Sequence, residues 1–104
     1  MATTSKALFR GAASTSSTTL YTLPTTSTTT VVTNVLVANT AASAATFDLS
    51  IDSVQIANDI VVAANDTLSI DLKQVIPANA TPKTITGLAS ATTVNFHISG
   101  VEIV

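Results

Sequence analysis

The stretch Asp66–Leu72 reads DTLSIDL, and its apolar residues occupy every second position. Leu68, Ile70 and Leu72 therefore fall on one face of an extended chain, while polar residues take the other face. Such period-two alternation indicates a β-strand that buries one of its faces. The stretch Thr46–Asp52, TFDLSID, repeats the scheme with Phe, Leu and Ile on the inner face. Both segments predict half-buried strands.

Similar segments follow one another through the chain, separated by turns rich in Asn, Asp, Ser and Pro. The further strands expected are Lys6–Arg10, Thr18–Leu23, Thr29–Asn39, Val54–Val62, Lys83–Ala89 and a C-terminal strand from Val94. No window of a dozen residues carries the 3.6-residue apolar stripe of a helix. The sequence therefore predicts an all-β fold, a single β-sandwich of about eight short strands, and both immunoglobulin-like and jelly-roll strand orders fit it.

The segment Thr29–Asn39 is apolar on both of its faces. One face is expected to carry Val31, Val35 and Val37, and the other Val32, Leu36 and Ala38. A strand that is covered on both sides has this pattern. We expect it to lie centrally in the sandwich or under a neighbouring subunit.

The C-terminal segment changes its alternation at Gly100. Apolar residues take the even positions from Val94 to Ile98, and then the odd positions Val101 and Ile103. One extra residue in a strand has this effect, so the pattern predicts a β-bulge at Gly100.

The N-terminal residues are less clearly patterned than the rest. We expect an extended N-terminal arm over residues 1–15 that pairs with a neighbour, followed by the sandwich domain over residues 16–104. The N-terminus lacks the apolar region of a secretory signal. The longest apolar runs are also far shorter than a membrane helix needs, so we expect no membrane partner.

The composition points toward an assembly. Charged residues make up 10% of the 104 residues, and the net charge is −2. An ordinary soluble domain has about 25% charged residues, and a nucleic-acid partner would require a basic surface. A surface with so little charge has little protection against association, and sheet edges invite pairing. We therefore expect a homo-oligomer that binds no nucleic acid.

No pattern of residues points to a reaction. The chain has no cysteine and one histidine, His97, which alternation places opposite the apolar face of its strand. A lone histidine without nearby ligands does not make a metal site, and the aspartates do not have calcium-loop spacing. A Lys6–Asn95 isopeptide bond is disfavoured, since it would need a carboxylate beside the pair in an apolar pocket. We predict no enzymatic activity, no catalytic residue, no metal and no cofactor.

Three stretches carry a resemblance to a known group. They are Thr18–Pro24 (TTLYTLP), Thr30–Thr40 (TVVTNVLVANT) and Val94–Ile103 (VNFHISGVEI). Over most of residues 18–104 the chain resembles small virion structural proteins of tailed bacteriophages. The resemblance implies a β-sandwich with a place on the virus particle, made in the cytoplasm of a bacterial host. Head-decoration, neck and tail proteins all share such sandwiches.

Among these, we expect a capsid decoration (cement) protein on the outer surface of the head. It would bind the major capsid protein or other virion proteins, with a trimer at three-fold points favoured. A ligand that binds only the assembled lattice stabilises that lattice by mass action. The alternatives are a neck, tail or fibre component and a receptor- or glycan-binding module.

The expected interface combines the arm with the two-faced strand. Its residues are Lys6, Leu8, Phe9, Arg10, Val31, Val35 and Val37. In the arm, Leu8 and Phe9 would anchor an added strand, while Lys6 and Arg10 would pair with capsid carboxylates.

Overall fold

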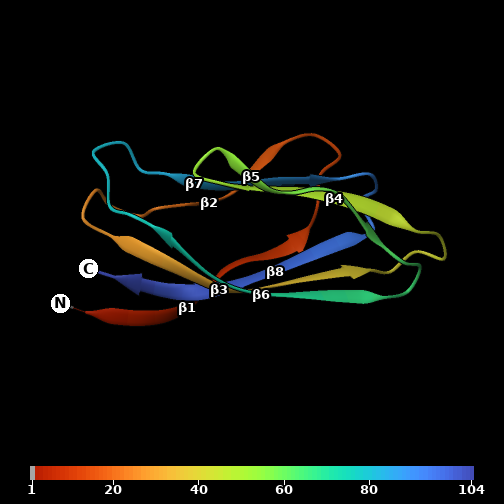
Figure 1. The fold of residues 1–104 in the computed structure, drawn as a ribbon, viewed down its shortest axis with the longest axis horizontal. Helices are drawn as coiled ribbons and strands as arrows, with labels where there is room; N and C mark the ends of the chain where they lie inside the picture. Colours follow the sequence, from red (N-terminus) through yellow and green to blue (C-terminus); the bar gives the residue numbers. More distant parts are fainter. Residues whose placement is uncertain (1) are drawn as a thin grey trace.

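The computed structural model describes residues 2–104, which form two four-stranded antiparallel sheets and contain no helix. The strands are β1 (Thr3–Ala12), β2 (Thr18–Thr22), β3 (Thr29–Asn39), β4 (Ala45–Ile51), β5 (Val54–Val62), β6 (Thr67–Ile76), β7 (Thr84–Ala89) and β8 (Val94–Ile103). Sheet A has the order β1-β8-β3-β6, and sheet B has the order β2-β7-β4-β5. Figure 1 shows the sheets as two facing layers. The predicted all-β sandwich is confirmed.

The strand order also decides which sandwich this is. β4 and β5 form a hairpin, and β3 pairs with β6, β2 with β7 and β1 with β8, so the pairs are nested around that hairpin. Successive pairs alternate between the two sheets. This arrangement is the eight-stranded jelly roll, in which two Greek keys wrap around one core.

The residues of the β4–β5 turn favour the hairpin around which the other strand pairs are arranged. Asp52 and Ser53 connect β4 to β5 with φ angles of 54° and 62°. Two residues with positive φ make the turn whose twist matches that of paired strands. Asn65 also has a positive φ, of 54°, in the connection from β5 to β6. Asn and Asp tolerate this conformation better than other residues that carry a side chain.

The core lies between the inner faces of the sheets. Phe47, Leu49 and Ile51 of β4 are buried, as the alternation predicted. Phe96 of β8 meets Phe47 edge to face, with ring centroids 5.8 Å apart. Burying each such side chain contributes roughly 1.5–3 kcal/mol, so these strands hold the two layers together.

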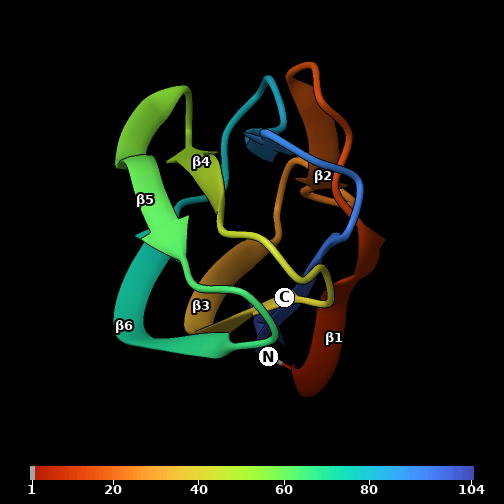
Figure 2. The ribbon, with the colours of Figure 1, turned by 90° about the vertical axis from the view of Figure 1, so that its right-hand side faces the viewer.

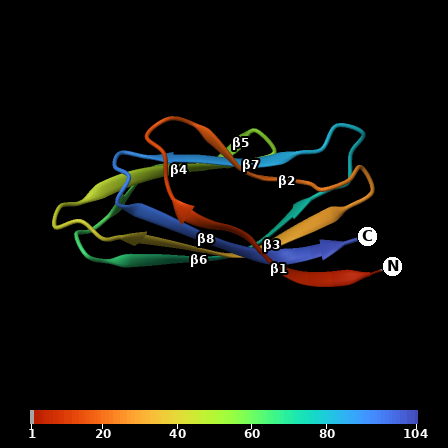
Figure 3. The same cartoon turned by 180° about the vertical axis from the view of Figure 1, so that it is seen from behind.

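The expected free arm is instead a strand of the sandwich. β1 pairs with β8 from Thr3 to Ala12 and forms an edge of sheet A. Ala2 and Val104 extend the pairing with two further backbone hydrogen bonds, of 2.9 and 3.1 Å. Ala2 and Val104, near the two ends of the chain, therefore lie side by side. After β1 the chain crosses to sheet B, as Figure 3 shows. The boundary expected at residue 15 does not separate two structural units, because β8 offers β1 a partner within the same chain.

The β-bulge expected at Gly100 was also wrong. In β8 the even positions stay on the inner face throughout, including Gly100 and Glu102. The extra residues belong to the neighbours of β8: Leu8 in β1 and Thr33 in β3. A Cβ at Gly100 would collide with the backbone oxygen of Val31, so this inner position requires glycine. The apolar residues after Gly100 therefore face outward.

The irregularity at Thr33 divides β3 differently from the prediction. Before it, Val32 points inward and Val31 outward; after it, the odd positions Val35 and Val37 point inward. The two apolar faces are confirmed, but Val31 shares its face with Leu36 rather than with Val35. β3 is a central strand of sheet A, but its outer face is not covered by the described chain: Leu36 is 38% exposed and Val31 is half-buried.

Candidate functional site: two interaction surfaces

The outer face of sheet A is built from residues that the strand register aligns in rows. The rows are Thr3, Ile103 and Thr29; Ser5, Val101, Val31 and Val75; Ala7, Ser99, Asn34 and Asp71; Arg10, His97, Leu36 and Ser69; Ala12, Asn95, Ala38 and Thr67. Residues opposite one another in a sheet share a face. Arg10 and Asp71 are the charged residues in these rows, and the Asp71 carboxylate accepts a hydrogen bond of 3.1 Å from Asn34. Lys73, which alternation places on the same face of β6 as Asp71 and Val75, lines an open hollow together with Thr33 and Asp71. The charged residues of this face are therefore few: Arg10, Asp71 and Lys73.

One end of this face is apolar. Val101, Val31 and Val75 form a continuous row, with Ile103 in the next row. Val75 is 59% exposed, while the other three are half-buried. An aliphatic row on a face with few charges can pack against another protein while few charges are desolvated.

The expected interface residues of β1 divide between the core and the surface. Leu8, expected as an anchor for a partner, is buried in the core of its own chain, and Phe9 packs partly against that core. Lys6 and Arg10 are exposed. Lys6 already pairs with Glu102, with Nζ–Oε distances of 3.3 and 3.4 Å.

The three valines expected at the interface are also divided. Val35 and Val37 are 2% and 0% exposed and pack inside the sandwich. They are wrong as contact residues, because the irregularity at Thr33 turns them inward. Val31 remains on the outer face, in the apolar row.

The structure separates the other residues that the sequence had singled out. His97 is exposed on the outer face of sheet A, opposite Arg10 and Leu36, which agrees with the alternation. Lys6 pairs with Gly100 and Asn95 with Ala12, so these two lie far apart along the ladder. No isopeptide bond can join them.

A buried polar network links the two sheets, and the sequence reasoning missed it. Glu102 of β8 is 9% exposed and accepts a hydrogen bond of 2.5 Å from the hydroxyl of Tyr21 in β2. The Thr30 hydroxyl lies 2.8 Å from the same Tyr21 oxygen and donates to it, since the Tyr21 proton is already used. Burial, followed by the hydrogen bond to Glu102, raises the pKa of Tyr21 to about 12.

The sequence contains an indication of this network, but the apolar residues around Glu102 point to the opposite face. The even-numbered inner positions of β8 continue to Glu102 without a break. A glutamate is rarely buried unless it is paired, so the alternation of Val101 and Ile103 appeared to define the inner face. The partner, Tyr21, is distant in sequence and comes into contact only through the fold.

Asn39 forms a second buried polar centre, at the end of β3. Its amide nitrogen donates to the backbone oxygens of Ser43, Val62 and Ala63. Its amide oxygen accepts from the backbone of Ala41 and the hydroxyl of Thr93. One side chain thus connects the β3–β4 loop, the end of β5 and the β7–β8 loop.

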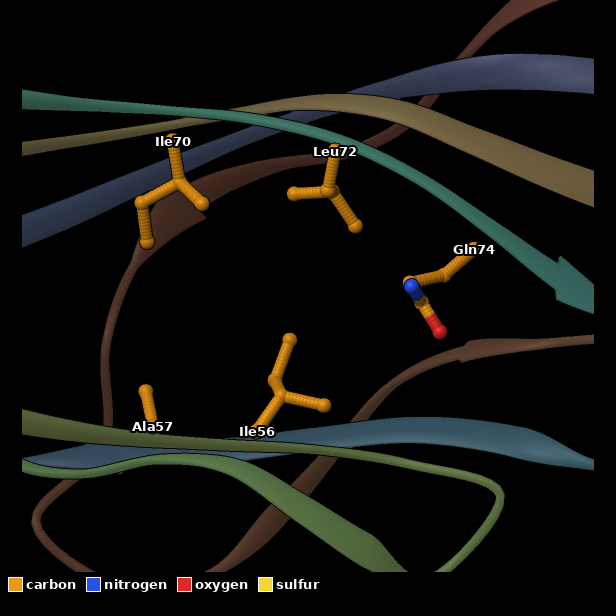
Figure 4. A pocket seen from close by; sticks show the side chains of 5 residues that line it. All are labelled: Ile56, Ala57, Ile70, Leu72 and Gln74. Atoms are coloured by element: carbon orange, nitrogen blue, oxygen red, sulfur yellow. The ribbon is translucent and has the colours of Figure 1, made fainter.

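The second surface is an open edge of the sandwich between β5 and β6. Figure 2 shows these two strands on one side of the molecule and β1 on the other. Between them lies an open cleft of about 360 Å³, lined by Ile56, Ala57, Ile70, Leu72 and Gln74. In Figure 4 the side chains of Ile56 and Leu72 point toward one another across it. The lining of the cleft is aliphatic except for Gln74, and none of these lining residues is charged.

Residues 2–104 contain no group of three or more His, Cys, Asp or Glu side chains placed to hold a metal ion. Within the same range, no helix is long and apolar enough to cross a membrane.

No protein-family model matches the sequence, and no curated protein matches it. Solved structures do match. A chain in the structure of the infectious bursal disease virus Gx strain aligns over 97% of this chain and 32% of its own length, at 15% identity and a TM-score of 0.55. A chain in the crystal structure of the viral particle of the same virus aligns over 97% and 30%, at 12% identity and a TM-score of 0.56.

The C-terminal domain of the sugar-binding protein EclA matches 96% of this chain and 75% of its own, at 16% identity and a TM-score of 0.46. The present chain spans about a third of the length of the two virus chains. The likeness to those virus chains shows a shared sandwich fold.

Proposed function

We propose that this chain is a non-enzymatic structural protein of a tailed-bacteriophage particle, and that it decorates the outer surface of the capsid. The observation that carries the proposal is the outer face of sheet A, where the rows combine low charge with the aliphatic residues Val31, Val101 and Val75. Such a face can dock flat on a protein lattice. The sandwich fold shared with a chain of a virus particle supports the same class of protein.

The lattice contact is proposed on the apolar end of this face rather than on an inserted arm. β1 is part of sheet A, and Leu8 belongs to the core. Deleting β1 would therefore destabilise the fold and could not test the contact. Arg10 remains available at the surface for a capsid carboxylate. Binding to the assembled lattice alone would stabilise it by about 2.7 kcal/mol at a free concentration of 100 Kd.

The glycan-binding alternative has less support from the structure. Sugar sites commonly use an exposed aromatic ring as a platform. Tyr21, Phe47 and Phe96 are buried, and Phe9 packs against the core. These are all the aromatic residues of the chain.

Two measurements test the proposal. The first is the copy number relative to the major capsid protein in purified virions, by quantitative mass spectrometry. We expect a ratio of about one, or a simple fraction such as about one third, for a component that follows the lattice symmetry. A ratio in the low hundredths would overturn decoration in favour of a neck, tail or fibre position.

The second measurement is binding of the purified protein to particles that lack it. Val101→Lys places a charge in the apolar row and should weaken binding at least tenfold, since the charge would have to be desolvated. Val61→Lys, at an exposed valine on the outer face of sheet B, is the matched control and should bind like the unaltered protein. Equal binding by both variants would remove the outer face of sheet A as the contact.

A further inference from the structure

The two sides of the sandwich differ in whether a segment of the chain covers the core between the sheets. On the side of β1 and β2, the connecting segment crosses between the sheets: Ala13 donates to the backbone oxygen of Val94, and Ala89 donates to that of Ser14. Leu8, Ala13 and Tyr21 are buried there. On the side of β5 and β6 no segment of residues 2–104 crosses between the sheets along the cleft. Of its lining residues Ala57 is buried, and the other four are partly or largely exposed. The core is closed on one side and open on the other.

The exposed residues on the open side belong to the inner face of sheet B. Val54 pairs with the buried Ile51, and Ile60 pairs with the fully buried Phe47. Cross-strand partners share a face, so Val54 and Ile60 would be core residues if anything covered them. They are nevertheless 66% and 38% exposed, and Ile56 between them is 43% exposed.

Sheet A contributes matching residues to this opening. Ile70 and Leu72 of β6 face the cleft and are only partly buried. The β5–β6 edge patch consists of Val54, Ile56 and Ile60 of β5 together with Ile70 and Leu72 of β6. Its five residues are aliphatic and come from two layers.

We propose that a second copy of this chain covers the β5–β6 edge patch, forming a two-fold dimer with a continuous core across the two sandwiches. The inference goes beyond the virion role and does not depend on it. A two-layered opening needs a two-layered partner, and a second copy presents the same two sheets at the same spacing. The centre of a homodimer interface is more apolar than the rest of the protein surface, and the five aliphatic residues of the patch give this edge that composition.

A single added strand fits the edge less well. β5 is irregular at two places opposite Phe47–Ser50, and β6 shifts register opposite the Thr33 irregularity. Such bulges interrupt the row of backbone groups that a partner strand would pair with. Side-chain packing against the patch does not require a continuous row.

The available area and charge also suit a second copy. β5 has nine residues, which at ~3.3 Å per residue, with sheets ~10 Å apart plus side chains, gives a footprint of roughly 600 Å² per copy. The total of about 1,200 Å² reaches the lower end of specific interfaces. Because the patch carries no charge, two copies brought together there do not repel each other through it.

The test is the mass of the purified full chain by light scattering, over a dilution series extending to high concentration. We expect the mass of two chains, each 10.6 kDa, at high concentration. Ile56→Lys should raise the dissociation concentration at least tenfold, since a two-fold interface meets each substitution twice. Leu36→Lys is the matched control: Leu36 is 38% exposed, similar to Ile56, but lies on the outer face of sheet A. It should dimerise normally.

Val54→Lys is the second variant in case Ile56→Lys does not fold, because Val54 is the more exposed and loses less packing. Its expected effect is the same. A chain that stays monomeric at every concentration overturns the proposal, as does a dimer that Leu36→Lys disrupts and the patch variants do not. A three-chain mass overturns the two-fold arrangement. If the chain is monomeric but Ile56→Lys abolishes binding to virus particles, the patch has a different occupant.

Discussion

Replacing Tyr21 by Phe should weaken the connection between the two sheets. The substitution removes one hydroxyl, which donates to Glu102 at 2.5 Å and lies 2.8 Å from the Thr30 hydroxyl, and keeps the ring in place. A hydrogen bond to a charged group contributes about 1.5–3 kcal/mol, and a buried acceptor left without its partner carries a similar cost. Lys6 remains near Glu102 and limits the loss.

We therefore expect the free energy of unfolding to fall by about 2–3 kcal/mol. For a domain of this size, that loss lowers the Tm by about 10 °C. Urea unfolding followed by circular dichroism gives the free energy directly. The m-value should not change, because the surface exposed on unfolding is nearly the same.

Two further variants make the measurement specific. Thr30→Val removes the neighbouring hydroxyl, and combining it with Tyr21→Phe should give a coupling of at least 0.5 kcal/mol, as expected for residues in contact. Thr19→Val removes a hydroxyl from an exposed position of β2 and should change stability by no more than about 0.5 kcal/mol. A Tyr21→Phe protein as stable as the unaltered one would refute the idea that this network holds the sheets together.

Three other outcomes follow from particular contacts. Tyr21 should titrate with a pKa of about 12 in the folded protein, against about 10 in denaturant. Because the native state favours the protonated hydroxyl, the stability that this hydroxyl confers is complete below pH 10 and is lost as the pH rises toward 12. Tyrosinate absorbance measures this titration directly, because the chain has one Tyr and no Trp. Gly100→Ala should lower the free energy of unfolding in urea by about 2–3 kcal/mol, because the added Cβ would meet the backbone of Val31. Gly11→Ala should cost less, because its Cβ meets only the Phe9 ring. Similar losses for the two variants would contradict this packing argument. Asn39→Ala should lower the Tm by more than 10 °C, at a cost of about 2–4 kcal/mol for several buried backbone groups left unpaired; an unchanged Tm would show that water replaces the amide.

Much of the fold could be predicted from the sequence because alternation is a local property. The bounds of Thr29–Asn39 and Val54–Val62 agree with the strands of the structure, and the inner face of β4 was predicted correctly. What failed was the assignment of faces near irregularities. An extra residue at Thr33 reverses the faces of β3, and it arises from pairing with β8 and β6, which local pattern does not contain.

The proposed surfaces were less accessible from sequence for the same reason. Arg10 and Val31 were predicted as contacts and lie at the surface, while Leu8, Val35 and Val37 were predicted and lie in the core. The β5–β6 edge patch could not have been found by alternation. Its residues have an ordinary core pattern, and they are exposed because no part of residues 2–104 covers that side of the sandwich.

The sequence by itself determined the class of fold and the scarcity of charge, since period-two alternation and composition are read directly from the chain. The tertiary structure alone decided the jelly-roll order, the inclusion of β1 in sheet A and the meeting of Glu102 with Tyr21. All three depend on which distant strands pair. That choice is made by the shared burial of two whole sheets, and no single segment encodes it.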